Sequence, residues 1–198
     1  MEFFLRAKGL PRRLGIFPGT FNPPTRAHMA LARAALACVD EVVFVLPRVF
    51  PHKEYEGATF EQRVDMLRAA LAGEPRFSIA STDQGLFIDV ARECRAEYGD
   101  IALAFLCGRD AAERIINWDY GRPGAIDGML DVFSLLVASR QGNYIPPARL
   151  AHRVTALPVD EALDEVSATD VRSRVRKGHP WEHLVPEQIY DQVRTVYS

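Results

Sequence analysis

Cysteine is scarce in this sequence. Its 198 residues include only three cysteines, Cys38, Cys94 and Cys107. No two of them form a Cys-x-x-Cys pair, and an odd number cannot all be joined in disulfide bonds. This argues against a small secreted domain built on disulfides and suits a reducing compartment. We therefore expect the protein to act in the cytoplasm.

The sequence also lacks an excess of charge of either sign. It has 24 Lys and Arg against 26 Asp and Glu, for a formal net charge of −2, so no overall positive field would draw it to nucleic acid or to an anionic membrane. The longest apolar runs, 42–46 and 101–106, are far too short to cross a bilayer, and the N-terminus lacks the features of a signal peptide. We expect no nucleic-acid partner and no membrane partner, and any anion site must be local.

The two commonest phosphate-binding motifs are missing. The chain contains neither G-x-x-x-x-G-K-[ST] nor G-x-G-x-x-G, which removes the main support for a P-loop NTPase or a dinucleotide-binding dehydrogenase. His179 and His183 are four residues apart, but Pro180 and Trp181 lie between them and no third ligand has matching spacing. The sequence therefore predicts no protein-held metal site.

The sequence does contain an alternation of short apolar strands with helical patterns. We expect strands at 14–17, 41–46, 77–80, 101–106, 133–138 and 154–157. We expect helices over 25–37, from a Thr59-x-x-Gln62 capping box to Gly73, over 87–98 and 110–117, and two short ones starting near Ser167 and Pro186. This order predicts an α/β fold with a doubly wound, mainly parallel sheet, in a single domain over 14–198. Residues 1–13 are interpreted as a frayed N-terminal extension.

In open parallel sheets, ligands bind beyond the carboxyl ends of the strands, so the loops that follow strands are the places to search. The first loop is crowded, with Pro18 to His28 reading PGTFNPPTRAH. Gly19 would let a ligand approach the backbone, and Thr20 and Asn22 add side-chain donors. Thr25 and His28 lie three apart at the start of a helix, where both could reach one anion. The alternative is that Thr25 only caps the helix and His28 only packs.

A second polar segment, 166–172, reads VSATDVR. Ser167 is a good N-cap residue, Thr169 lies in the first helical turn, and Arg172 follows on the same face. Two hydroxyls and a guanidinium at a helix N-terminus can hold the outer phosphates of a triphosphate. The alternative is a capped surface helix with a basic, solvated face.

A third polar segment, CGRD at 107–110, follows the most apolar strand. Gly108 at the end of a strand permits close ligand approach, and Asp110 can accept hydrogen bonds from ribose hydroxyls. Trp118 follows eight residues later. The alternatives are that Asp110 is an ordinary helix cap and that Trp118 is an ordinary core aromatic.

Together these motifs resemble those of the nicotinate and nicotinamide mononucleotide adenylyltransferases, HxGH-type nucleotidylyltransferases whose first loop reads G-G-[ST]-F-[DN]-P-x-H-x-G-H. The first loop of this chain departs from that pattern at Pro18, Thr25 and Ala27, and a Thr at the position of Thr25 is similar to the variant of eukaryotic members. Residues 166–172 resemble the late motif I-S-S-T-x-[IV]-R. The resemblance covers residues 14–197 and is nearest to the bacterial nicotinate mononucleotide adenylyltransferases.

The resemblance implies transfer of the AMP moiety of ATP to a pyridine mononucleotide, with Mg²⁺ carried on the ATP. It implies that His28 and Arg172 stabilise charge in catalysis, with Thr25 at the first His position of the motif. The ATP and phosphate contacts that it implies are Gly19, Thr20, Phe21, Lys53, Ser167 and Thr169. The ribose and acceptor contacts that it implies are Gly108, Asp110, Trp118, which would stack on the pyridine ring, and Arg140.

One departure from the family pattern bears on the acceptor. Leu86-Phe87 stands where nicotinate-specific members usually have Tyr-Thr, which removes a polar contact from the pyridine pocket. A different acceptor, such as nicotinamide mononucleotide or pantetheine phosphate, and CTP in place of ATP therefore stay open. So does a non-catalytic nucleotide-binding homologue, in which Pro18 and Thr25 would mark a degraded site. Whether the chain forms a homo-oligomer also stays open.

Overall fold

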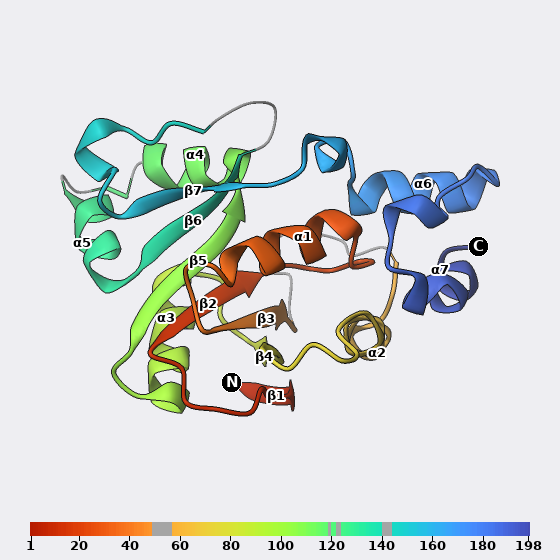
Figure 1. Ribbon diagram of the computed structural model, residues 1–198, viewed down its shortest axis with the longest axis horizontal. Coiled ribbons are helices and arrows are strands. Elements are labelled where there is room, and N and C mark those ends of the chain that lie inside the picture. Colours follow the sequence, from red (N-terminus) through yellow and green to blue (C-terminus); the bar gives the residue numbers. More distant parts are fainter. Residues whose placement is uncertain (49–56, 119, 122–123, 140–143) are drawn as a thin grey trace.

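The computed structural model describes residues 1–48, 57–118, 120–121, 124–139 and 144–198. In this part of the chain, seven strands form one sheet in the order β1-β4-β3-β2-β5-β6-β7 (Figure 1). Only β1 is antiparallel to its neighbour, β4. The strands are β1 (Glu2–Leu5), β2 (Arg13–Pro18), β3 (Glu41–Pro47), β4 (Phe77–Thr82), β5 (Ala102–Gly108), β6 (Ser134–Ser139) and β7 (Val154–Pro158).

Helices cover both faces of this sheet, which confirms the predicted α/β fold class. They are α1 (Arg26–Ala35), α2 (Phe60–Ala70), α3 (Phe87–Tyr98), α4 (Arg109–Asn117), α5 (Ala125–Val132), α6 (Ala168–Lys177) and α7 (Tyr190–Tyr197). Along β3, Val42, Phe44 and Leu46 pack on the side of α1, α2, α6 and α7, whereas Val43 and Val45 pack on the side of α3, α4 and α5. From Val42 to Pro47 the strand is apolar, as expected where both faces of a strand are buried.

The order of the strands creates a switch point between β2 and β5. From β2 the chain continues outward to β3 and β4, and from β5 it continues in the other direction to β6 and β7. The connections that leave β2 and β5 therefore diverge to opposite faces, which opens a crevice at the carboxyl ends of these two strands. Gly19 follows β2 and Gly108 ends β5, so two of the predicted ligand loops border this crevice.

The N-terminal segment is not frayed, and that prediction was wrong. Strand β1 extends the sheet along β4, with Phe3 opposite Ala80, and the ring of Phe4 packs edge-on against Phe60 at 5.6 Å. Further along, the backbone N–H groups of Arg12 and Arg13 donate to the Asp40 carboxylate at 2.8 and 2.9 Å. These contacts hold the segment in place, but their partners are 27 or more residues away in sequence.

Helix α5 was not predicted either. Its N-cap is Gly124 in the left-handed conformation, without a side-chain capping hydrogen bond, so the usual sequence signal of a helix start is absent. Across the described ranges, no helix is both long and apolar enough to cross a membrane.

Candidate functional site

The loop after β2 is held by an aromatic anchor. Phe21 has φ +47° and is 1% exposed, and its ring packs 5.3 Å from Phe17 and 5.2 Å from His28. A Cβ atom on Gly19 would lie 2.8 Å from this ring, so Gly19 makes room for Phe21. The N–H of Gly19 donates to the Val45 carbonyl at 3.1 Å. Two residues predicted to contact phosphate therefore shape the loop, with the Phe21 side chain in the core.

Thr25 and His28 form a reciprocal capping box at the start of α1. The Thr25 hydroxyl accepts from the backbone N–H of His28, and the backbone N–H of Thr25 donates to Nδ1 of His28 at 3.0 Å. The Thr25 hydroxyl also lies 2.9 Å from Nδ1. Since a ring nitrogen that accepts an N–H bond carries no proton, the neutral imidazole bears its hydrogen on Nε2. The helix start thus selects the tautomer of His28.

Thr25 itself is 0% exposed, which corrects its predicted role. A fully buried side chain cannot touch a ligand in this arrangement, and the contacts of Thr25 are those of a helix cap that orients His28. Of the two interpretations of the sequence for Thr25, the structure shows the helix cap. His28 is half-buried beside the aromatic anchor.

The late motif lies directly against the first loop. Nη1 of Arg172, on α6, donates to the backbone carbonyl of Asn22 at 2.7 Å, across 150 residues of sequence. Nη2 of the same guanidinium lies 3.4 Å from the Thr169 hydroxyl. Ser167 caps α6 by accepting from the N–H of Asp170 at 3.1 Å, and both Ser167 and Thr169 are exposed. The predicted pairing of the two loops is present in the structure.

Two other residues have structural roles beneath the first loop. The Asn22 side chain is buried, and Oδ1 accepts from the N–H of Ala58, so the prediction that it faces a ligand was wrong. Arg63, which sequence reasoning missed, is 1% exposed and donates to the carbonyls of Thr20 (3.1 Å) and Pro47 (3.4 Å). The signal was a cation at an apolar helical position, between Phe60 and Leu67. The Arg63 guanidinium places a buried positive charge under the first loop.

The segment after β5 opens toward two neighbouring pockets. Gly108 caps α4, and a Cβ there would meet no atom within 4 Å. Asp110 is exposed in the first turn of α4 and lines a pocket of about 640 Å³ together with Trp118. Trp118 is 67% exposed, so it is not a core aromatic.

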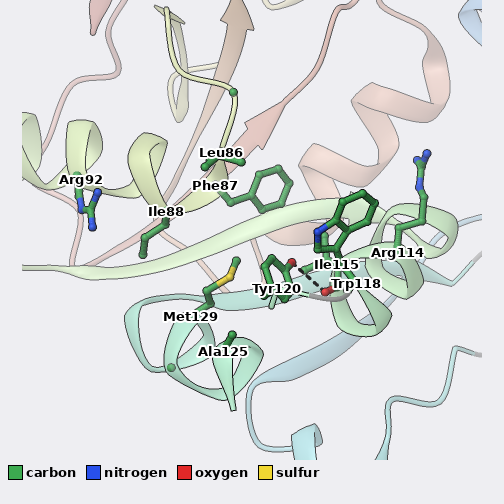
Figure 2. A pocket seen from close by; sticks show the side chains of 12 residues that line it. Leu86, Phe87, Ile88, Arg92, Arg114, Ile115, Trp118, Tyr120, Ala125 and Met129 are labelled. Atoms are coloured by element: carbon green, nitrogen blue, oxygen red, sulfur yellow. Dashed lines mark hydrogen bonds between the residues drawn. The ribbon is translucent and has the colours of Figure 1, made fainter. Parts of the chain in front are cut away.

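Trp118 also borders a second pocket, of about 700 Å³, between the ends of α3, α4 and α5 (Figure 2). Leu86 and Phe87, the pair that departs from the family pattern, lie in its wall, and Phe87 stacks on Phe105 with ring centroids 4.4 Å apart. The opposite wall includes Met129 and Tyr120, whose hydroxyl donates to the Ile115 carbonyl at 3.0 Å. Most of the lining is apolar, and the side chains of Arg92 and Arg114 also border the pocket.

Comparison with known proteins agrees with the observed fold. Residues 16–174 match the family model described as cytidylyltransferase-like. The chain belongs to this family. A probable nicotinate-nucleotide adenylyltransferase of Shouchella clausii is 32% identical, over 94% of this chain and 97% of the relative. A probable nicotinate-nucleotide adenylyltransferase of Carboxydothermus hydrogenoformans is 30% identical, over 91% and 94%. Within the cytidylyltransferase-like family, the chain therefore belongs with the nicotinate-nucleotide adenylyltransferases, and the resemblance identified from its motifs is confirmed.

Solved structures of adenylyltransferases show the same fold. Plasmodium falciparum nicotinic acid mononucleotide adenylyltransferase complexed with NaAD superposes with a TM-score of 0.72 at 18% identity, over 93% of this chain and 95% of that one. A putative nicotinate-nucleotide adenylyltransferase from Vibrio parahaemolyticus gives 0.63 at 14% identity, over 94% and 98%.

Three further points complete the site of this nucleotidyltransferase. Lys53 and Arg140, both predicted to contact the substrates, lie outside the described residues. Burial raises the pKa of Cys107, just before Gly108, to about 12, so its thiol stays protonated and is no nucleophile. Within the described ranges, no three His, Cys, Asp or Glu side chains gather as metal ligands would.

Proposed function

We propose that this protein joins the AMP moiety of ATP to nicotinate mononucleotide. A phosphate oxygen of the acceptor attacks the α-phosphorus of ATP in line, the bond from that phosphorus to the bridging oxygen breaks, and pyrophosphate leaves. The observation that carries the proposal is the bond from Arg172 to the carbonyl of Asn22. It supports a single triphosphate cradle built from the N-termini of α1 and α6, where free N–H groups and the helix dipoles favour an anion.

In this reaction the protein has to align the two substrates and stabilise charge, and no general base is needed. The acceptor phosphate is already ionised at neutral pH, so catalysis rests on alignment and on neutralising the charge that spreads over the phosphates. In the proposal, Nε2–H of His28 and the guanidinium of Arg172 stabilise that charge. The hydroxyls of Thr20, Ser167 and Thr169 bind the outer phosphates, and Lys53 would bind them as well. Gly19 and Phe21 contribute through the shape of the loop backbone.

Mg²⁺ is proposed to arrive on ATP. Phosphate oxygens are the hard ligands that this ion prefers, and it would neutralise the charge of the triphosphate when bound. The chain's part is then to bind the remaining phosphate oxygens through the hydroxyls and cations named above.

The acceptor is proposed to lie along α4. Asp110 would accept from a ribose hydroxyl at Gly108, Trp118 would stack on the pyridine ring, and Arg140 would lie near the nucleotide. The apolar wall at Leu86 and Phe87 lacks the polar pair of nicotinate-specific members. Arg92 and Arg114 line the same pocket, and their positive charges would favour the carboxylate of nicotinate. Nicotinamide mononucleotide is therefore the second candidate acceptor.

A panel of acceptors tests the proposal. The purified protein is incubated with Mg²⁺ and ATP or CTP, together with nicotinate mononucleotide, nicotinamide mononucleotide or phosphopantetheine, and pyrophosphate is measured. We expect release with ATP and nicotinate mononucleotide to be fastest. Faster release with another acceptor would replace the proposed substrate. Tight ATP binding without release under any condition would indicate a nucleotide sensor.

Tryptophan fluorescence locates the acceptor independently of turnover. The emission of the wild-type protein should change on adding nicotinate mononucleotide and not on adding phosphopantetheine. The Trp118→Phe variant is the control, because it keeps the buried Trp181 and should lose the response. A response that survives in this variant would argue against stacking on Trp118.

We also propose that the protein works in the cytoplasm. Its three cysteines are all free thiols, which supports a reducing compartment. Fractionation of the source cells tests this proposal. Recovery of the protein outside the cytoplasmic fraction would contradict it.

A further inference from the structure

Asn22 is a meeting point of four segments that are far apart in the sequence. It is 3% exposed. Its side-chain Oδ1 accepts from the backbone N–H of Ala58 at 3.1 Å and from the hydroxyl of Tyr197 at 2.5 Å. Its backbone carbonyl accepts from Arg172 at 2.7 Å. The first loop is thereby tied to the segment before α2, to α6 and to α7.

Tyr197 makes its contact from the last turn of the C-terminal helix. It is 3% exposed and belongs to the same apolar cluster as Phe21 and Val193, so its ring is held by packing and its hydroxyl is aimed at one acceptor. On another side, the amide of Asn22 abuts Gly57, where an added Cβ would lie 2.6 Å from Nδ2. The Asn22 side chain is enclosed, and its orientation follows from these partners.

We propose that Tyr197 is a positioning residue of the active site. Its hydroxyl holds the amide of Asn22, the carbonyl of Asn22 holds the guanidinium of Arg172, and three residues further on the same loop the capping box holds His28. The inference rests on the proposed function, since it assumes that Arg172 and His28 act on the phosphates. Phosphoryl transfer depends on alignment within about an ångström, so a loosened Asn22 would slow it without removing any group that touches substrate.

The test removes one oxygen atom. Tyr197→Phe keeps the ring in the core and deletes only the hydroxyl. Tyr190→Phe is the matched control, because it makes the same change in the same helix. Its ring packs on Trp181 at 5.8 Å, and in the described part of the chain its hydroxyl forms no hydrogen bond. We expect Tyr197→Phe to lower kcat/KM for ATP by about tenfold and to weaken ATP binding severalfold in calorimetry, and Tyr190→Phe to leave both within twofold.

Variants of Asn22 separate positioning from stability. Asn22→Asp keeps an acceptor oxygen for Tyr197 and should retain more of the activity than Asn22→Leu, which should lower kcat/KM strongly but to a measurable value. If Tyr197 acts through Asn22, Tyr197→Phe adds little to the loss in the Asn22→Leu protein. All assays are run at 25 °C, with melting curves confirming that each variant is folded.

Two results would overturn the inference. One is an unchanged kcat/KM and an unchanged ATP dissociation constant in Tyr197→Phe. The other is a full additive effect of Tyr197→Phe on top of Asn22→Leu. If the wild-type protein releases no pyrophosphate, the proposed function fails instead. The ATP titration then decides by itself whether Tyr197 positions the cradle, with unchanged binding in Tyr197→Phe counting against it.

Discussion

The chemistry of His28 depends on its immediate neighbours. The backbone N–H of Thr25 occupies Nδ1, and the rings of Phe17 and Phe21 pack beside the imidazole at 5.9 and 5.2 Å. These contacts hold one ring orientation and one tautomer, with the N–H on Nε2. A side chain whose orientation is already fixed does not have to reorganise when charge develops nearby. A hydrogen-bond donor contributes most to catalysis under this condition.

Replacing His28 should therefore affect rate more than folding. We expect His28→Ala to lower kcat by roughly 30-fold or more, since a donor that strengthens in the transition state contributes on the order of 2–4 kcal/mol. Steady-state pyrophosphate release measures the effect, and circular dichroism checks the fold. The control is His152→Ala, an exposed histidine in the turn before β7, which is an edge strand of the sheet. Near-normal turnover in the His28 variant would refute its role.

At the scale of elements, two helices point their N-termini at one place. Helix α1 follows the first loop, and α6 approaches it from a segment 150 residues later through Arg172. The cap of α6 at Ser167 and the ion pair from Arg174 to Asp170, at 2.7 Å, do not involve Arg172. The helix can therefore persist without that guanidinium, so the proposed contribution of Arg172 to catalysis can be tested separately from the stability of the helix.

Arg172→Ala should lower turnover by about 100-fold, the usual effect of removing one donor from a charge-stabilising site. Arg172→Lys should recover part of the loss, because it restores the charge without the forked geometry. Lys177→Ala, an exposed cation at the other end of α6, serves as the control and should leave the rate unchanged. Equal losses in the Arg172 and Lys177 variants would indicate a general charge effect in place of a specific contact.

At the scale of the whole molecule, the double-sided core determines how stability depends on pH. Burial raises the pKa of both Cys94 and Cys107 to about 12, with the nearby Glu93 adding to the effect at Cys94. In the unfolded chain these thiols ionise near their ordinary pKa of about 8.5. Since the unfolded state then loses protons that the folded state keeps, the free energy of unfolding is unaffected below that pH and falls as pH rises toward 12.

We therefore expect urea unfolding to give a lower free energy at pH 9.8 than at pH 7.5. The Cys94→Ala and Cys107→Ala variants will each be less stable than the wild type at both pH values. In each variant, however, the free energy of unfolding should fall less between pH 7.5 and pH 9.8 than it does in the wild type. The comparison is made below pH 10 so that Tyr98, whose pKa is also raised by burial and by its bond to Glu41, contributes little. An identical drop in all three proteins would contradict the assignment.

Local features of this molecule could be predicted because their causes are local. The cap at Thr25, the capping box at Thr59, the cap at Ser167 and the apolar run of β3 involve residues within about four positions of one another, and each leaves a pattern in the sequence. The same holds for the loops after β2 and β5, since a strand followed by polar residues already places them at one edge of the sheet.

What the sequence determined by itself was the order of strands β2 to β7 and of the helices other than α5, the caps at Thr25, Thr59 and Ser167, and the two polar loop motifs. Only the tertiary structure decided that β1 pairs with β4, that Thr25 and Asn22 are buried, that Trp118 is exposed, and that Tyr197 and Arg172 converge on one loop. The physical reason is the range of the interaction. A hydrogen bond within a helical turn is specified by its own residues, whereas a bond across 150 or more residues exists only once the core has brought its two partners together.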